Sequence, residues 1–258
     1  MILSADYHTH TTFSHGKDSI LDNALSAKER GLKELAITDH CYGHRMYGIK
    51  QKKVPYMKEL CREASLKTGV NVLFGVEANI LGESGKTDMK IADMEYMDIY
   101  LAGVHKFITY DALKEWYQLL YKNWFYKHFS KPPKELVERN TKVYINAIKS
   151  NPIDIIAHPG YCCFIDAYEV AKCCADYGTY FEIDTRKTHL LDDEWEKVLL
   201  SSVKFVVDSD AHSKDKVGLV GEAENLINRV GISKDRIVNI DGKLPKYFRF
   251  SEYKKKNL

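Results

Sequence analysis

Short apolar segments alternate with stretches of helical periodicity along most of this chain, and this alternation constrains the fold more than any other feature. Strands that alternate with helices form a parallel sheet, and 258 residues suit one closed β/α barrel domain spanning residues 1–258. The predicted strands are Ile2–Tyr7, Glu34–Thr38, Val70–Val76, Asp98–Val104, Ile153–Ala157, Thr179–Ile183 and Val203–Val207. The predicted helices are Ser19–Arg30, Met57–Thr68, Lys134–Ser150, Ala167–Tyr177, Asp193–Ser201 and Glu222–Val230.

Local signals refine the ends of these elements. Asp18 is placed to cap the helix that starts at Ser19, and Gly31 is placed to end it. The segment GLVGEAEN, which contains Gly218 and Gly221, has the pattern of a turn that starts a helix rather than a dinucleotide-binding fingerprint. Arg236–Ile240 fits either an eighth strand or a closing edge of the barrel.

Residues 107–133 interrupt the alternation with a dense run of Tyr, Trp and Phe. We expect this run to be helical up to Pro132 and Pro133, which cannot continue a helix. The favoured interpretation is an amphipathic helix that buries its aromatic side chains in the core. The alternative is a lid or a homo-oligomer contact, because aromatic side chains dominate such surfaces.

Composition narrows the possible partners and the compartment. The net charge is +2, and the single basic run, Lys254–Lys256, is most simply a solvated tail, so we expect no nucleic-acid partner. No apolar run approaches the ~20 residues that span a bilayer, so no membrane association is expected. The N-terminus has no secretory pattern, and the six cysteines show no disulfide or Cys-x-x-Cys spacing. We therefore expect a cytoplasmic protein with reduced thiols.

Histidines and carboxylates follow the predicted strands at the point where each strand ends. In a parallel β/α barrel the carboxyl ends of the strands meet at one mouth, where active sites lie. Seven of the ten histidines occupy such positions or the loop just after them, together with one glutamate and one aspartate. The nine residues are His8, His10, His15, His40, Glu77, His105, His158, Asp210 and His212.

This set of donors predicts a metal centre. Neutral imidazole and carboxylate together suit zinc, manganese or iron. Nine donors exceed what one tetrahedral ion can use, and a carboxylate can bridge two ions, so two or three ions are expected. Any single member of the set, taken alone, is better explained as an ordinary polar residue at a strand end. Their convergence on one mouth favours the metal site.

The motifs DYHTHTTFSHG, ITDH, GVEANI, AGVH, IIAHPG and DSDAH, in this order, resemble those of the polymerase-and-histidinol-phosphatase (PHP) family of metal-dependent phosphoesterases. The resemblance covers nearly the whole chain. GVEANILGESGKTD and the HPG motif are most similar to the small bacterial zinc phosphatases of the family. The resemblance implies a distorted seven-stranded TIM-like barrel with a trinuclear centre of divalent Zn, Mn or Fe ions.

Carried over position by position, the resemblance also implies a ligand set for each ion. The first ion would be held by His8, His10, Glu77 and Asp210. The second would share Glu77 with the first and add His105 and His158, and the third would be held by His15, His40 and His212. Among these residues, Glu77, Asp210 and His212 are the expected catalytic residues.

Residues outside this set provide candidate substrate contacts. Arg186 follows the sixth predicted strand, and its planar guanidinium suits phosphate oxygens, so we expect it to bind the substrate phosphate. A surface salt bridge is the alternative, and Arg45 is a weaker candidate for the same role. His44, His128 and His189 are expected to be ordinary surface or core residues. Because His44 and His189 follow strand ends, a position at the mouth is the less favoured alternative for these two.

The function predicted from these observations is hydrolysis of a small phosphorylated metabolite by a metal-dependent phosphomonoesterase. Histidinol phosphatase activity is one alternative, and a nuclease or nucleotide phosphodiesterase is another. A non-enzymatic metal-binding barrel is the third. Loop residues decide which leaving group is accepted, and the motifs do not specify them.

Overall fold

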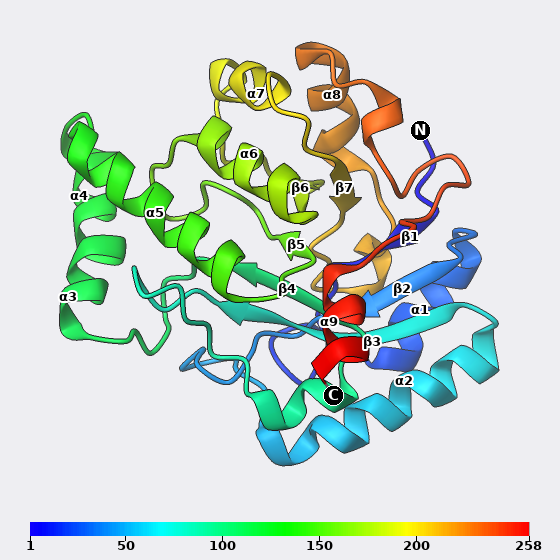
Figure 1. Ribbon diagram of the computed structural model, residues 1–258. Coiled ribbons are helices and arrows are strands. Elements are labelled where there is room, and N and C mark those ends of the chain that lie inside the picture. Colours follow the sequence, from blue (N-terminus) through cyan, green and yellow to red (C-terminus); the bar gives the residue numbers. More distant parts are fainter. Residues whose placement is uncertain (258) are drawn as a thin grey trace.

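The computed structural model describes residues 1–257, and it shows one seven-stranded parallel sheet that curls into a barrel (Figure 1). The strands follow one another in sequence order, each parallel to the next. They are β1 Ala5–Asp6, β2 Glu34–Ile37, β3 Asn71–Asn79, β4 Ile99–Gly103, β5 Ile155–Ile156, β6 Tyr180–Asp184 and β7 Phe205–Asp208. The predicted α/β barrel is confirmed.

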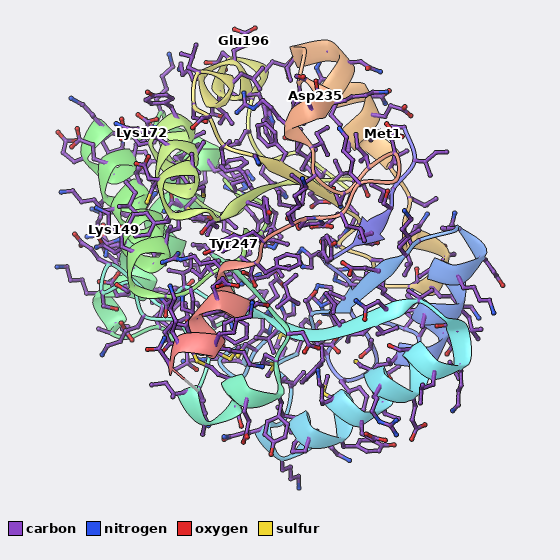
Figure 2. All side chains as sticks on the ribbon, turned by 45° about the vertical axis from the view of Figure 1, so that its right-hand side comes forward. Met1, Lys149, Lys172, Glu196, Asp235 and Tyr247 are labelled. Atoms are coloured by element: carbon purple, nitrogen blue, oxygen red, sulfur yellow. The ribbon has the colours of Figure 1, made fainter. Side chains whose placement is uncertain are left out.

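The helices lie on the outside of this barrel, and their exposed side chains, such as Lys149, Lys172 and Glu196, point away from it (Figure 2). The α-helices are α1 Ile20–Glu29, α2 Val54–Thr68, α3 Leu113–Trp116, α4 Asn123–Phe129, α5 Lys134–Ser150, α6 Ala167–Tyr177, α7 Asp192–Leu199, α8 Gly221–Val230 and α9 Arg249–Asn257. Short helical turns are η1 Gln51–Lys53, η2 Ile91–Tyr96, η3 Tyr117–Lys122, η4 Lys214–Lys216 and η5 Lys234–Arg236, of which η3 is a π-helical turn. Within residues 1–257, no helix combines the length and the apolar character needed to span a membrane.

The start of α1 corrects one expectation. Ser19, not Asp18, is the N-cap, because Asp22 stands three residues after Ser19 and the two form a reciprocal capping box. The Ser19 hydroxyl oxygen accepts from the Asp22 N–H, and the Asp22 carboxylate accepts from the Ser19 N–H, both at 3.2 Å. Asp18 instead accepts a hydrogen bond of 2.8 Å from the Lys214 N–H. The predicted turn before α8 is confirmed, since that helix begins at Gly221.

The barrel closes between β1 and β7 through residues that precede and follow those strands. The His10 N–H donates to the Ala211 carbonyl at 2.8 Å, above the ends of both strands. Below them, the predicted segment 236–240 acts as a closing edge: Ile237 bridges to Phe205, and Ile240 bridges to Leu3. These isolated bridges replace an eighth strand and leave the barrel seven-stranded.

Asn239 joins the two sides of this seam with its side chain. Its amide nitrogen donates to the carbonyls of Ala5 at 3.0 Å and Val207 at 2.7 Å, and its amide oxygen accepts from the Val207 N–H at 2.9 Å. The residue is fully buried. Every polar atom of this side chain therefore satisfies a backbone group of β1 or β7.

The end of the barrel opposite the strand carboxyl ends is covered by residues 244–250. Phe248 packs edge-on against Tyr7, with ring centroids 5.4 Å apart, inside a cluster formed by inward-facing strand residues. The Tyr180 hydroxyl donates to the Tyr247 carbonyl at 2.8 Å, and the Asp154 carboxylate accepts from the Phe250 N–H at 2.8 Å. This packing leaves the opposite mouth as the open end.

The aromatic run at 107–133 is helical as predicted, but its aromatic side chains do not lie in the core. α3, η3 and α4 form one helix over residues 113–129, which ends before the two prolines. Its buried residues are Leu119 and Asn123, whereas Trp124 and Phe129 are 49% and 66% exposed. The favoured interpretation is wrong because an aliphatic and an amide side chain anchor this helix, which leaves the rings on the outer face.

We predict that Asn239→Ala lowers the free energy of unfolding by about 2–4 kcal/mol, because it leaves buried backbone groups on both sides of the seam without partners. Urea denaturation followed by circular dichroism measures this change. Asn71→Ala is the matched control, because the Asn71 amide binds Glu34 at an exposed site. A loss below about 1 kcal/mol for Asn239→Ala would show that the backbone bridges close the seam without the side chain.

Candidate metal centre

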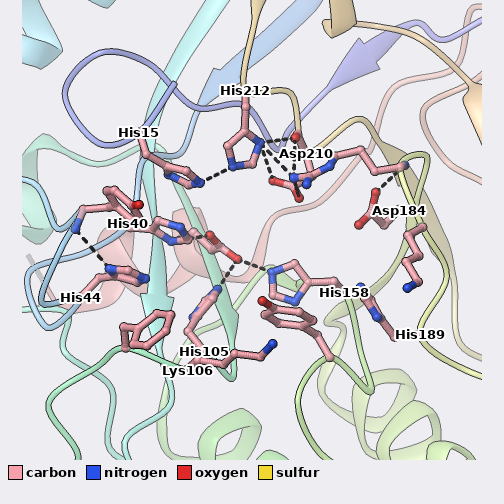
Figure 3. A pocket seen from close by; sticks show the side chains of 16 residues that line it. His15, His40, His44, His105, Lys106, His158, Asp184, His189, Asp210 and His212 are labelled. Atoms are coloured by element: carbon pink, nitrogen blue, oxygen red, sulfur yellow. Dashed lines mark hydrogen bonds and ion pairs between the residues drawn. The ribbon is translucent and has the colours of Figure 1, made fainter. Parts of the chain in front are cut away.

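The structure brings all nine predicted donors together at the carboxyl ends of the strands. Figure 3 shows those that line the cavity, among them His15, His40, His105, His158, Asp210 and His212. His8 and His10 follow β1, His40 follows β2, and Glu77 lies within β3. The others are His105 after β4, His158 after β5, Asp210 and His212 after β7, and His15 in the loop before α1. The parallel topology makes residues that are up to 204 positions apart in the sequence neighbours in space.

Glu77 lies at the middle of the cluster and is fully buried. Its Oε1 lies 2.8 Å from His105 Nε2 and 2.6 Å from His158 Nε2. Its Oε2 lies 2.8 Å from His40 Nδ1 and 3.4 Å from His8 Nε2. Each carboxylate oxygen thus faces a different pair of imidazoles, which is the arrangement that a bridging carboxylate requires.

The remaining donors surround this centre on the side of β1 and β7. Asp210 Oδ1 lies 3.1 Å from His10 Nε2 and 3.6 Å from His8 Nε2. His15 Nε2 and His212 Nε2 are in contact, and the His15 and His40 rings stack with centroids 4.8 Å apart. The donor atoms form four sets within 4.8 Å: His8–His10–Asp210, His8–Glu77–His158, His40–Glu77–His105 and His10–His15–His40.

These residues fit a site for divalent metal ions. Imidazole nitrogens point at one another and at the same carboxylate. Glu77 Oε2 and His40 Nδ1 lie 2.8 Å apart, yet neither of these buried atoms makes a hydrogen bond within the described residues. Burial lowers the pKa of His15 to about 3 and that of His105 to about 4, so both rings are neutral at pH 7, as metal ligands must be. Which of the nine donor residues would bind which ion is a prediction from the family resemblance.

The charge of Glu77 dominates the electrostatics of the cluster. Burial opposes its ionisation, but His105, His8 and His40 outweigh burial and hold the Glu77 pKa well below its usual value. Burial likewise lowers the pKa of His158, but Glu77 outweighs burial and raises this pKa to about 9. A divalent cation would take the place of the His158 proton, so metal binding releases a proton here.

Glu182, on β6, orients two of the donors, and the sequence analysis missed it. Its Oε1 lies 2.7 Å from His8 Nδ1, which leaves His8 Nε2 directed at Glu77 and Asp210. Its other oxygen accepts from the N–H of His158. A carboxylate that fixes the ring of a ligand histidine is a common support of metal sites. A glutamate inside the buried segment YFEID was the signal for this role.

Two further buried carboxylates hold the loops that carry donors. Asp39 accepts from the N–H of Thr11 at 2.7 Å and from the hydroxyls of Thr11 and Ser14, which fixes the loop before His15. Asp6 accepts from the Ser209 N–H at 3.0 Å and the Ser209 hydroxyl at 2.5 Å, next to Asp210. Burial raises the pKa of both carboxyls, and these hydrogen bonds oppose the rise.

The backbone at two donors is in a region that residues other than glycine seldom occupy. His158 has φ +28° and Asp210 has φ +44°. Such conformations cost about 1–3 kcal/mol each and persist where the surrounding structure enforces them. Gly103 makes room for one of these side chains, because a Cβ there would lie 2.9 Å from His158 Cε1. The fold therefore accepts local strain to bring the donors together.

A cavity of about 380 Å³ opens above the donors. His44 and His189 line it, which corrects the expectation that both are ordinary surface or core residues, and Arg186 lines it as well; His128 lies at the surface, as expected. The sequence analysis did not assign its other lining residues, which are Tyr47, Lys106, Phe107, Tyr161, Asp184 and Lys187. Burial and the charge of Asp210 raise the pKa of Asp184 to about 7.

Arg186 lies on the cavity wall beside the donors. Its Nη1 donates to Asp210 Oδ2 at 2.5 Å and lies 3.0 Å from His212 Nδ1, while its side chain is 53% exposed. Arg45 does not line this cavity among the described residues; it borders another one with Tyr110 and Trp116. The position of Arg186 is compatible with contact to a phosphate at the donors.

A parallel β/α barrel whose mouth gathers seven histidines, a glutamate and an aspartate belongs to the class of barrels built around a metal centre. The PHP domain family model matches residues 6–186. The chain is 33% identical, over 96% of both sequences, to a probable phosphatase of Thermoanaerobacter sp. (strain X514). It is also 33% identical to a probable phosphatase of Caldanaerobacter subterraneus, over 92% of this chain and 87% of that one. The chain therefore belongs to the PHP family, as predicted.

The fold is similar to that of the histidinol phosphate phosphatase of Lactococcus lactis, solved in complex with zinc, L-histidinol and phosphate. The TM-score is 0.61 at 16% sequence identity, over 95% of this chain and 100% of that one. At this identity the likeness shows the fold alone.

We predict that Glu182→Ala weakens metal binding about 10- to 100-fold, because the His8 ring loses the partner that orients it. Glu182→Gln keeps a hydrogen-bond acceptor and should lose less. Competition of the purified variants with a chromophoric zinc chelator measures the affinities. Glu169→Ala, at an exposed position in the first turn of α6, is the control. Equal affinities in the wild type and Glu182→Ala would contradict the orienting role.

Proposed function

We propose that this chain is a metal-dependent phosphomonoesterase that hydrolyses a small phosphorylated metabolite. The observation that carries the proposal is Glu77: a buried carboxylate with imidazoles at both oxygens, at the floor of a cavity whose wall also presents Arg186, Lys106 and Lys187. A phosphate group in this cavity would meet the metal donors on one side and the cationic side chains of the wall on the other. The family and the names of the relatives support the same activity.

Three divalent ions of zinc, manganese or iron are proposed, each with the ligand set that the family resemblance implies. Glu77 would bridge two ions, one held with His8, His10 and Asp210 and the other with His105 and His158. His15, His40 and His212 would hold the third. The close donor groups overlap these sets but divide some residues differently: His40 lies with Glu77 and His105, His8 with Glu77 and His158, and His10 with His15 and His40. His212 contacts His15. Bound ions would supply Lewis-acid chemistry and offset the negative charge of the phosphoryl group.

The residues of the chain itself divide into three roles in this proposal. Glu77, Asp210 and His212 hold the reacting centre and are the proposed catalytic residues. Arg186 would bind the phosphate through its guanidinium, which presents two donors in one plane. Glu182 orients the His8 ring, and Asp39 holds the loop that carries His15.

The proposed activity is tested with p-nitrophenyl phosphate in the presence of zinc or manganese, and with Glu77→Gln. The wild type should hydrolyse the ester, and Glu77→Gln should lose activity by orders of magnitude, because it keeps the side-chain size but removes the charge that two cations share. Elemental analysis should find two to three ions in the wild type and fewer in the variant. A folded, metal-loaded protein without turnover would overturn the enzyme assignment and favour a metal-binding barrel.

A panel of substrates separates this proposal from its enzymatic alternatives. Bis(p-nitrophenyl) phosphate reports diesterase activity, oligonucleotides report nuclease activity, and histidinol phosphate is one member of a set of phosphorylated metabolites. We expect monoesters to be hydrolysed fastest. A higher kcat/KM for the diester or for oligonucleotides would replace the phosphatase by a phosphodiesterase.

We further predict that Arg186→Ala lowers kcat/KM about 10- to 100-fold while the metal content stays unchanged. Charge-assisted hydrogen bonds contribute roughly 1.5–3 kcal/mol, and arginine is not a metal ligand. Arg186→Lys should restore little of this activity, because the lysine ammonium group lacks the planar pair of N–H donors that binds two phosphate oxygens. Arg229→Ala, which breaks an exposed ion pair with Asp192, is the matched control. A loss of activity that follows loss of metal would assign Arg186 to the support of Asp210 instead.

A further inference from the structure

Residues 113–129 form a helix whose outer face is a continuous ridge of large apolar side chains. This helix stands outside α5, at the left edge of the molecule in Figure 1. The ridge, called the aromatic ridge below, consists of Leu113, Trp116, Tyr117, Tyr121, Trp124, Phe125 and Phe129. Its rings touch in succession: Tyr117 with Tyr121 at 5.4 Å, Tyr121 with Trp124 at 6.2 Å, and Trp124 with Phe129 at 5.7 Å between centroids.

The exposed area of the aromatic ridge is of the size that a protein interface needs. Its six rings are 39–66% exposed, and Leu113 is 80% exposed. An aromatic side chain presents about 150–250 Å², so the ridge leaves roughly 600 Å² of apolar surface uncovered. This area is at the upper end of the range for the largest apolar patch on a monomeric protein. It is close to the ~800 Å² that one partner contributes to a standard interface.

The charges along the helix indicate which partner fits. Asp111 precedes its first turn, Lys114 lies in that turn, and Lys122, Lys127 and Lys131 lie in and after its second half. None of these has an ion-pair partner within the described residues. An antiparallel copy of the same helix, centred on Tyr121, would bring Asp111 opposite Lys131 and Lys114 opposite His128. A parallel copy would set lysines against lysines. The net charge of +2 adds little repulsion between two chains.

We propose that the aromatic ridge is the interface of a homodimer, in which two copies of residues 113–129 pack antiparallel about a twofold axis near Tyr121. The other side of α4 supports the ridge from within: the Asn123 amide oxygen accepts from Asn140 at 2.9 Å and from the Phe164 N–H at 3.0 Å. Asn123 and Lys127 also line a second cavity, and His189 lines both this cavity and the one above the donors. The helix that carries the ridge therefore borders, on its inner side, a cavity next to the one above the donors.

Sedimentation velocity over a range of protein concentrations tests the assembly. The wild type should sediment as a species with twice the mass of one chain, which is 29.7 kDa. Tyr121→Asp should weaken the dimer at least 100-fold, because a twofold interface contains the substituted residue twice. Tyr56→Asp is the matched control: Tyr56 lies on α2, is 53% exposed against 41% for Tyr121, and should leave the dimer intact. Circular dichroism checks that both variants are folded.

Disulfide cross-linking tests the antiparallel register. The background is Cys162→Ser, because the other five native thiols are buried. Tyr121→Cys should cross-link with itself under mild oxidation, whereas Leu113→Cys and Phe129→Cys should cross-link only when the two variants are mixed. Self-cross-linking of Leu113→Cys alone would overturn the antiparallel arrangement.

Three results would overturn the proposed interface. A wild-type monomer at all concentrations would exclude the dimer, and a dimer unaffected by Tyr121→Asp would place its interface elsewhere. A monomer that binds phosphatidylserine vesicles through the ridge would assign this face to a membrane surface instead. None of these measurements depends on phosphatase activity, so the dimer and the proposed function can fail separately.

Discussion

One buried carboxylate, Glu77, determines what the rest of the barrel has to provide. A charge in the interior is tolerated only where opposite charge or hydrogen-bond donors surround it, and here imidazoles from four other strand ends face its two oxygens. Glu182 fixes two of these residues, through the His8 ring and the His158 N–H, while hydrogen bonds to Asp39 and Asp6 hold the loops that carry His15 and Asp210. The strained backbone at His158 and Asp210 belongs to the same set of constraints.

The fold and the position of the cluster could be predicted because both follow from repeating patterns. The sequence alternates strand and helix, and the donors fall where the strands end, so the topology alone brings them together. The ends of the elements were less predictable: β1 and β5 are only two residues long, although longer apolar segments surround them. Around β1, isolated bridges at Leu3 and Thr9 take the place of further strand residues.

Supporting residues and surfaces were harder to predict, because single side-chain contacts decide them. Glu182 lies in a strand whose other residues have the pattern of a buried core strand, and only its contact with His8 shows its role. Whether the rings at 113–129 face inward depends on which side of the helix carries Leu119 and Asn123. The π-helical turn at Tyr117–Lys122 changes the helical phase within this segment, so periodicity alone could not assign its faces.

The seam between β1 and β7 has a consequence for the order in which the molecule is made. Tyr7 and Ser4 bond to Asp208 and Asn239, partners more than 200 residues away, and His8 meets Asp210 across the same gap. Contacts between such distant segments form late and make folding slow. During synthesis, β1 therefore stays unpaired on the edge that faces β7 until β7 and residues 236–240 have left the ribosome. The predicted donors lie on both sides of this seam, so the cluster is complete only when the barrel has closed, and an ion held by the complete cluster would bind after that step.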